Sequence, residues 1–131
     1  MSNESNVKSV CVNSQSQSLV EHRLKMYGEM RFSEIVEELS ESLGIEDFEN
    51  NDRFIAEQLV KVMAEVLCLP DDAPVRIEKI LRSARDVKEI YVQLEQSHIW
   101  EAVNNFKKID YQIKHLKAYY KVQIYNSFFE V

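Results

Sequence analysis

The chain contains only two glycines and two prolines among its 131 residues. An all-β fold needs many more of these residues, because its turns depend on the positive φ of glycine and the fixed φ of proline. Gly28 and Gly44 each follow an apolar stretch with helical spacing, while Pro70 and Pro74 enclose a short polar turn. We therefore predict a mainly α fold, a compact bundle of about five or six helices with at most one very short strand pair.

Hydrophobic residues form 45% of the chain, which is enough for a core. They recur every three or four positions in several stretches, and the last of these predicts a helix over about 111–128. The stretch 52–69 has the broadest apolar face, so we expect it to be the central helix. The triplet Val75-Arg76-Ile77 is too short to distinguish a strand from the start of a helix. The residues expected at the centre of the core are Leu59, Met63, Val66, Val103, Leu116 and Tyr120.

Residues 1–18 are rich in Ser, Asn and Gln, and we expect them to form a flexible N-terminal arm. Residues 19–131 are predicted to form a single helical domain. The first residues lack the basic start and apolar stretch of a signal peptide. No apolar run approaches the length of a membrane span. These features favour a cytoplasmic protein that does not bind membranes.

No pattern in the chain is typical of an enzyme or of a metal site. His22, His98 and His115 lie far apart, and none is at ligand spacing from a cysteine or an aspartate. Cys68 lies between two leucines and is expected to pack in the core, whereas Cys11 lies in the polar arm, so no disulfide is expected. Two isolated glycines also exclude the glycine-rich nucleotide-binding loops. We expect no catalytic residues, no metal and no cofactor.

Charge is distributed unevenly along the chain. Residues 1–74 hold 6 basic and 15 acidic side chains, whereas residues 75–131 hold 10 basic and 7 acidic ones. The acidic residues between Phe32 and Leu43 form either the solvated face of a helix or a surface that binds a basic partner. Trp100 is a candidate for an apolar contact with the same partner. The expected partner-binding residues are Glu34, Glu37, Glu38, Glu41 and Trp100.

Lysines and tyrosines alternate near the C-terminus. Lysine neutralises phosphate and an exposed tyrosine stacks on unpaired bases, so this mixture suits single-stranded or duplex DNA. The alternative is that the tyrosines pack inward and the lysines only face solvent. Lysines at 114, 117 and 121 are expected to share one face of the last helix. The candidate nucleic-acid-binding residues are Lys107, Lys108, Lys114, Lys117, Lys121 and Tyr119.

Five short motifs occur in a recognisable order over roughly 75 residues. They are Val66-Leu67-Cys68, Val75-Arg76-Ile77, His98-Ile99-Trp100-Glu101-Ala102-Val103, Ile113-Lys114-His115-Leu116 and Tyr125-Asn126-Ser127. In this order they resemble the C-terminal domain of the replication initiator A family of Gram-positive plasmids and mobile elements, a helical domain similar to primosomal DnaD-type domains. The chain departs from that family because it lacks the N-terminal winged-helix domain. It also lacks the usual Ala-Gly-Asp-Asp-Tyr-Pro turn after Ile77.

The resemblance implies a non-enzymatic interaction module of a mobile genetic element, related to a domain for host-factor contact in plasmid replication. Its expected partner is a host or element-encoded protein such as a replication factor, with DNA as a second ligand. Origin recognition is not implied, because the winged-helix domain is missing. The alternative is a small anti-CRISPR-like inhibitor that binds a nucleic-acid-binding protein of a host defence system.

Overall fold

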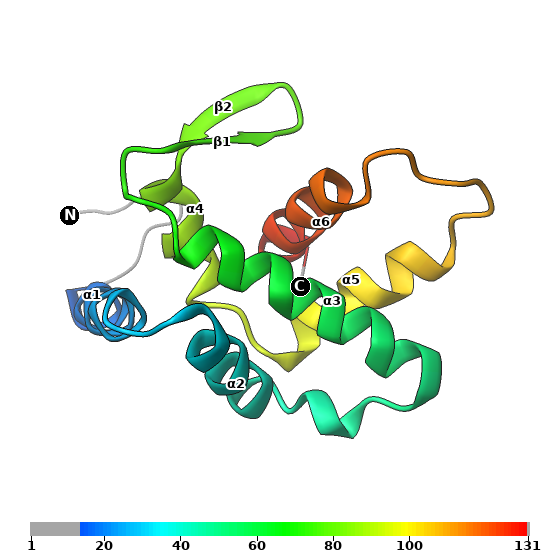
Figure 1. The fold of residues 1–131 in the computed structure, drawn as a ribbon, viewed down its shortest axis with the longest axis horizontal. Coiled ribbons are helices and arrows are strands. Elements are labelled where there is room, and N and C mark those ends of the chain that lie inside the picture. Colours follow the sequence, from blue (N-terminus) through cyan, green and yellow to red (C-terminus); the bar gives the residue numbers. More distant parts are fainter. Residues whose placement is uncertain (1–13, 131) are drawn as a thin grey trace.

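The computed structural model describes residues 14–130, which form six α-helices, one short 3₁₀ helix and one antiparallel hairpin (Figure 1). The predicted fold class is therefore confirmed. Residues 1–13 of the expected arm lie outside the described residues. Residues 14–18 of that arm belong to the first helix instead. The elements are α1 (Ser14–Gly28), α2 (Phe32–Ser42), η2 (Ile45–Asp47), α3 (Asn50–Leu67), β1 (Pro74–Ile77), β2 (Ile80–Ser83), α4 (Ala84–Tyr91), α5 (Gln96–Lys107) and α6 (Leu116–Glu130).

Helix α3 crosses the middle of the molecule, and α2, α4, α5 and α6 all pack against it (Figure 1). Its apolar residues occupy more than one side of the helix, as expected for a helix with neighbours in several directions. The buried residues of α3 are Ile55, Ala56, Leu59, Val60, Val62, Met63, Ala64, Val66 and Leu67. The breadth of its apolar face thus explains its central position.

The C-terminal helix starts later than the sequence pattern predicts. It begins at Leu116, and residues 108–115 form an irregular connection from α5. Tyr120 and Ile124 of α6 are buried, but Leu116 remains 41% exposed, so its expected place in the core was wrong. Leu116 fits the apolar repeat but occupies the first position of the helix, where the chain has not yet reached its packing partners. The other five predicted core residues are buried.

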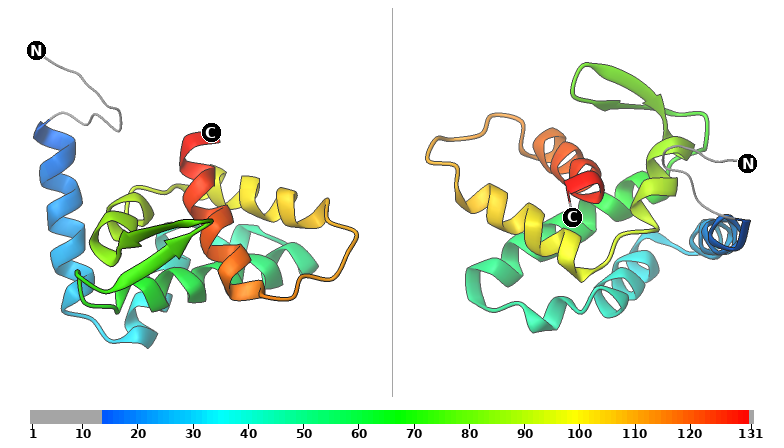
Figure 2. Two further views of the ribbon diagram at one scale, coloured as in Figure 1. Left: turned by 90° about the horizontal axis from the view of Figure 1, so that it is seen from above. Right: turned by 180° about the vertical axis from the view of Figure 1, so that it is seen from behind.

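The triplet Val75-Arg76-Ile77 is a strand. It pairs with β2 in antiparallel register, with Val75 opposite Arg82 and Ile77 opposite Ile80. Val75 and Ile77 are buried and β1 contacts α6, so the hairpin rests with one face on that helix (Figure 2). The guanidinium of Arg82 lies over the ring of Tyr125 at 5.2 Å, which adds a cation–π contact between the hairpin and α6.

Gly44 makes a tight reversal between α2 and η2. Its φ of 63° lies in the left-handed region, where a side chain is disfavoured. The Gln96 amide at the start of α5 donates hydrogen bonds to the carbonyls of Leu43 at 3.2 Å and Gly44 at 3.1 Å. The same amide donates to the Asp47 carboxylate at 3.0 Å. The reversal therefore depends on a residue far away in sequence, which holds α5 against the turn.

The burial pattern predicts a clear contrast between two leucine truncations. Leu59→Ala should lower the free energy of unfolding by about 2–5 kcal/mol, because Leu59 is 1% exposed and the change leaves a cavity. Leu116→Ala should cost less than about 1 kcal/mol, since that side chain is largely exposed. Urea denaturation of both variants provides the measurement. Equal losses would contradict this assignment of the core.

The two glycines should respond differently to substitution by alanine. At Gly44 an added Cβ would lie 2.5 Å from the Gln96 amide nitrogen and would strain a left-handed residue. Gly44→Ala should therefore destabilise the protein by about 1–3 kcal/mol. Gly28→Ala is the matched control, because a Cβ added there would have no atom within 4 Å. Thermal unfolding should show a lower midpoint for Gly44→Ala alone.

Candidate interaction surfaces

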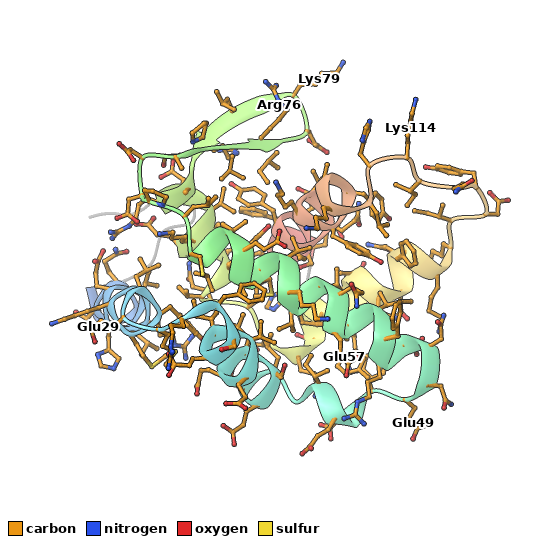
Figure 3. All side chains as sticks on the ribbon, viewed as in Figure 1. Glu29, Glu49, Glu57, Arg76, Lys79 and Lys114 are labelled. Carbon is orange, nitrogen blue, oxygen red and sulfur yellow. The ribbon has the colours of Figure 1, made fainter. Side chains whose placement is uncertain are left out.

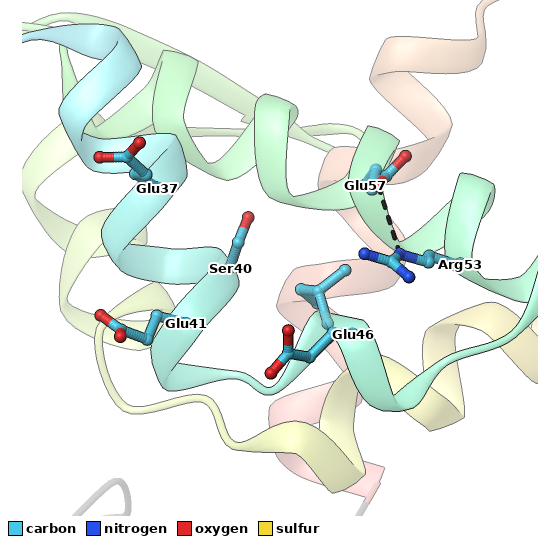
Figure 4. Close-up of a pocket in the computed structure, with 7 residues that line it drawn as sticks. Glu37, Ser40, Glu41, Glu46, Arg53 and Glu57 are labelled. Atoms are coloured by element: carbon cyan, nitrogen blue, oxygen red, sulfur yellow. Dashed lines mark ion pairs between the residues drawn. The ribbon is translucent and has the colours of Figure 1, made fainter.

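An acidic cavity of about 480 Å³ opens between α2, η2 and the first half of α3 (Figure 4). The reversal at Gly44 creates it, because this turn brings η2 beside the end of α2. Four carboxylates and one guanidinium line the cavity together with Ser40 and Ile45. The charged residues are Glu37, Glu41, Glu46, Arg53 and Glu57.

Most of the negative charge in the acidic cavity is not neutralised by the protein. Arg53 Nε lies 3.6 Å from Glu57 Oε2, one turn further along α3. Glu37, Glu41 and Glu46 are exposed, and none forms an ion pair with another described residue. Three carboxylates that line one cavity therefore present an uncompensated negative surface to solvent, which favours an approaching lysine or arginine.

The four glutamates expected to form one partner-binding surface lie in two stripes on α2. Glu37 and Glu41 are one turn apart and line the acidic cavity, whereas Glu34 and Glu38 form a neighbouring stripe. Glu34 accepts a hydrogen bond from the Arg31 backbone N–H at 2.8 Å, so it supports the start of the helix. Glu38 lines a different cavity, beside Tyr27. Burial raises the pKa of Tyr27, and the charge of Glu38 raises this pKa further.

Sequence reasoning missed Glu46 and Glu57, because nothing in the spacing shows that η2 and α3 approach α2. A signal was present in Gly44, which marks a reversal of the chain after α2. Trp100, the fifth predicted partner-binding residue, is half-buried. Its ring stacks on the buried Phe48 with centroids 3.9 Å apart, so it packs α5 against the chain after η2.

The predicted lysine cluster lies at the end of α5, in the first half of α6 and in the connection between these helices. Two of its members are tied to acidic residues of α3. Lys107 Nζ lies 2.9 Å from Asp52 Oδ1, and Lys117 Nζ lies 3.0 Å from Glu65 Oε2. These pairs reduce the charge available to a ligand.

The remaining lysines differ in exposure. Lys108 and Lys114 are exposed and form no ion pair with any described residue, whereas Lys121 is half-buried. Lys117 and Lys121 share a face of α6, but Lys114 precedes the helix, so the expected triplet on one helical face was wrong. The late start of α6 explains this difference.

Tyr119 is a poor platform for stacking on bases. It is half-buried, with its ring centroid 6.0 Å from Phe106 and 6.2 Å from Tyr120. Burial raises the pKa of Tyr119, with smaller contributions from Tyr111 and Tyr120. Tyr111 is instead 70% exposed in the connection between α5 and α6. The apolar pattern predicted that Tyr111 belongs to the last helix. Because α6 starts only at Leu116, Tyr111 lies in the connection instead.

The fold also adds the hairpin to the basic side of the molecule. Figure 3 shows Arg76, Lys79 and Lys114 pointing outward along one edge, with Glu49 and Glu57 in the opposite half. Residues 74–83 and 107–121 together carry eight basic and two acidic side chains. The rest of the chain carries eight basic and twenty acidic side chains. This segregation is sharper than the division between the two halves of the sequence.

Cys68 is exposed, so its predicted position in the core was wrong. Helix α3 ends at Leu67, and Cys68 follows it as the C-terminal capping residue. The apolar pattern continues through the cysteine, although the helix does not.

The exposure of Cys68 predicts rapid reaction with Ellman's reagent in the native state. The Cys11→Ser variant should release one equivalent of chromophore without denaturant, because the thiol at 68 is open to solvent. A Cys11→Ser/Cys68→Ser variant serves as the blank. A thiol that reacts only after denaturant is added would contradict the exposed position.

Among the described residues, no three or more His, Cys, Asp or Glu side chains are arranged so that they could hold a metal ion. Within the same part of the chain, no helix has the length and apolar character needed to cross a membrane. Comparisons with protein-family models, curated proteins and solved structures found no match for this chain.

Proposed function

We propose that this chain is a non-enzymatic interaction module of a mobile genetic element, and that it binds a basic surface of a protein partner. The observation that carries the proposal is the acidic cavity, where Glu37, Glu41 and Glu46 are exposed and not ion-paired within the described residues. A lysine or arginine that enters it would be close to several carboxylates at once. Such complementarity speeds association and selects against acidic partners.

Arg53 limits which partner fits the acidic cavity. Its guanidinium occupies one side of the cavity and pairs with Glu57 over a distance of 3.6 Å. This pair is solvent-exposed on both sides and contributes little stability, so a partner carboxylate or phosphate near Arg53 can replace it. A partner with several basic groups and one acidic group would complement the whole cavity.

The resemblance to replication initiator A domains supports a replication factor of the host or the element as the partner. In this proposal the module acts in the cytoplasm as an accessory to plasmid replication. DNA is a second ligand rather than the primary one, because the net charge of −6 opposes nonspecific binding to DNA.

A second candidate is favoured by the same carboxylates. A surface with several adjacent negative charges imitates the phosphates of nucleic acid, and a small protein of this kind can occupy the binding channel of a defence nuclease. In this alternative the chain is an anti-CRISPR-like inhibitor, and its partner is a nucleic-acid-binding protein. Nucleic acid and the chain would then compete for the same site on the nuclease. The first candidate predicts no such competition.

The role of the acidic cavity in partner binding can be tested by charge reversal, with a control variant that has the same change in net charge. Glu37→Lys/Glu41→Lys/Glu46→Lys should lose at least about tenfold in affinity for the captured partner, because attraction becomes repulsion. The control is Glu29→Lys/Asp72→Lys/Glu130→Lys, which changes three exposed residues outside the cavity. Immobilised wild type and both variants would be compared by capture from host lysate, mass spectrometry and titration of the purified partner. Equal losses in both variants would refute a role for the cavity.

The identity and behaviour of the captured protein separate the two candidates. A replication protein whose binding persists in the presence of short DNA supports the replication module. A defence nuclease that is displaced from the chain by its own nucleic acid supports the inhibitor. Neighbouring genes for replication and partition, or for other anti-defence proteins, provide an independent comparison.

A further inference from the structure

A second cavity, of about 600 Å³, lies between the start of α3, the end of α5 and the α5–α6 connection. Its walls are mainly apolar, with Phe106, Ile109 and Leu116 among them. Asn51 and Gln112, which carry amide side chains, also line it. This combination of apolar walls and a few hydrogen-bonding groups is typical of ligand-binding pockets, which have volumes of about 300–1,000 Å³.

Two of the side chains that line this second cavity are largely open to solvent. Tyr111 is 70% exposed and Leu116 is 41% exposed, although both are large and apolar. The connection from 108 to 115 contains no helix or strand, so its apolar residues gather over the cavity without being buried by another element. A ligand with a flat aromatic group would cover these exposed apolar residues.

The charge beside the second cavity limits the class of ligand. Lys107 lines it, and Lys108 and Lys114 flank the connection without ion pairs to described residues. Asp110 is the one acidic residue in the segment 107–121, against five lysines. Asp52 lies nearby, where it pairs with Lys107. The surroundings thus favour a ligand that combines negative charge with flat apolar groups.

We infer that the second cavity binds an unpaired base of a single-stranded nucleic acid, while the neighbouring lysines contact the flanking phosphates. Tyr111 provides the stacking surface, and the amides of Asn51 and Gln112 face the polar edge of the base. Stacking on an aromatic ring combined with lysine contacts to phosphate is the usual basis of single-strand binding. This inference does not depend on the acidic cavity, which lies on the other side of α3.

A single strand fits better than a duplex for a geometric reason. In a duplex the faces of the bases are covered by their neighbours, so the cavity could meet only a sugar edge or a phosphate. An unpaired base can leave the stack and enter the space beneath Tyr111. Binding would be largely independent of sequence, because two amides distinguish few base edges.

The basic side of the molecule offers a path for the rest of the strand. Lys117 and Lys121 continue along α6, which contacts the hairpin, and Arg76 and Lys79 lie exposed on the hairpin (Figure 3). The base would enter at the second cavity, and the phosphates would follow α6 toward the hairpin. Because Lys117 is paired with Glu65, its phosphate contact requires that this ion pair open.

The inference is tested by fluorescence anisotropy with a labelled DNA strand of about 15 nucleotides and the matching duplex, both at low salt. The single strand should bind more tightly than the duplex. Tyr111→Ala should weaken single-strand binding by about 5- to 150-fold, the range expected for loss of one stacked base. Tyr111→Phe keeps the ring and should bind like wild type. Phe129→Ala, which removes a similarly exposed ring at the far end of α6, is the matched control and should change nothing.

The phosphate contacts have a separate readout in the salt dependence. Lys108→Gln/Lys114→Gln should reduce the slope of log affinity against log salt by roughly 0.7 for each lysine that no longer neutralises a phosphate. The triple reversal at Glu37, Glu41 and Glu46 should not weaken strand binding, which keeps this test distinct from that of the proposed function. Circular dichroism checks that each variant is folded.

Three results would overturn the inference. Equal affinity for strand and duplex would show that no base enters the second cavity. Wild-type affinity in Tyr111→Ala would exclude stacking on this ring. Displacement of the strand by an oligoglutamate peptide at equal charge concentration would identify an acidic peptide as the better occupant.

Discussion

The burial of α3 on several sides is the interaction on which the rest of the structure depends. Each of α2, α4, α5 and α6 packs against this helix, so its apolar residues define the inner face of four others. The hydrophobic effect is proportional to the apolar area removed from water, and a central helix shares this gain among all its neighbours. The exposed residues of α3 include a polar strip of Arg53, Glu57 and Lys61, beside the exposed ring of Phe54. The acidic cavity lies along that strip because α2 and η2 cover the adjoining side.

The acidic residues of α3 also help to determine where each sign of charge lies. Asp52 and Glu65 contact lysines of α5 and α6, whereas Glu57 faces the acidic cavity. Ion pairs of this kind add little stability at the surface, but they determine which lysines remain available to bind a ligand. The helix thus separates two surfaces with different ligand preferences. A molecule with net negative charge can carry a basic side only when its charges are segregated in this way.

The fold was more predictable than the surfaces. Apolar periodicity identified the central helix, and Gly44 marked a real reversal of the chain. Leu116 and Cys68 were misplaced for related reasons. Leu116 is the first residue of α6 and Cys68 follows the last residue of α3, so both lie at helix ends although each fits the apolar pattern. Glu46 lines the same cavity as Glu37 because of how η2 meets α2, which local spacing does not encode. Likewise, the hairpin joins the lysines of α6 through tertiary packing that no single segment specifies.

The stacking of Trp100 on Phe48 makes the protein its own optical probe. Trp100 is the single tryptophan of the chain, and it joins α5 to the segment between η2 and α3. The emission wavelength of an indole follows the polarity around it, so the intrinsic fluorescence reports whether these two elements are docked. Because Trp100 lines neither the acidic cavity nor the second cavity, its signal distinguishes opening of the bundle from occupation of a surface. One native ring therefore allows folding and binding to be followed separately without an added label.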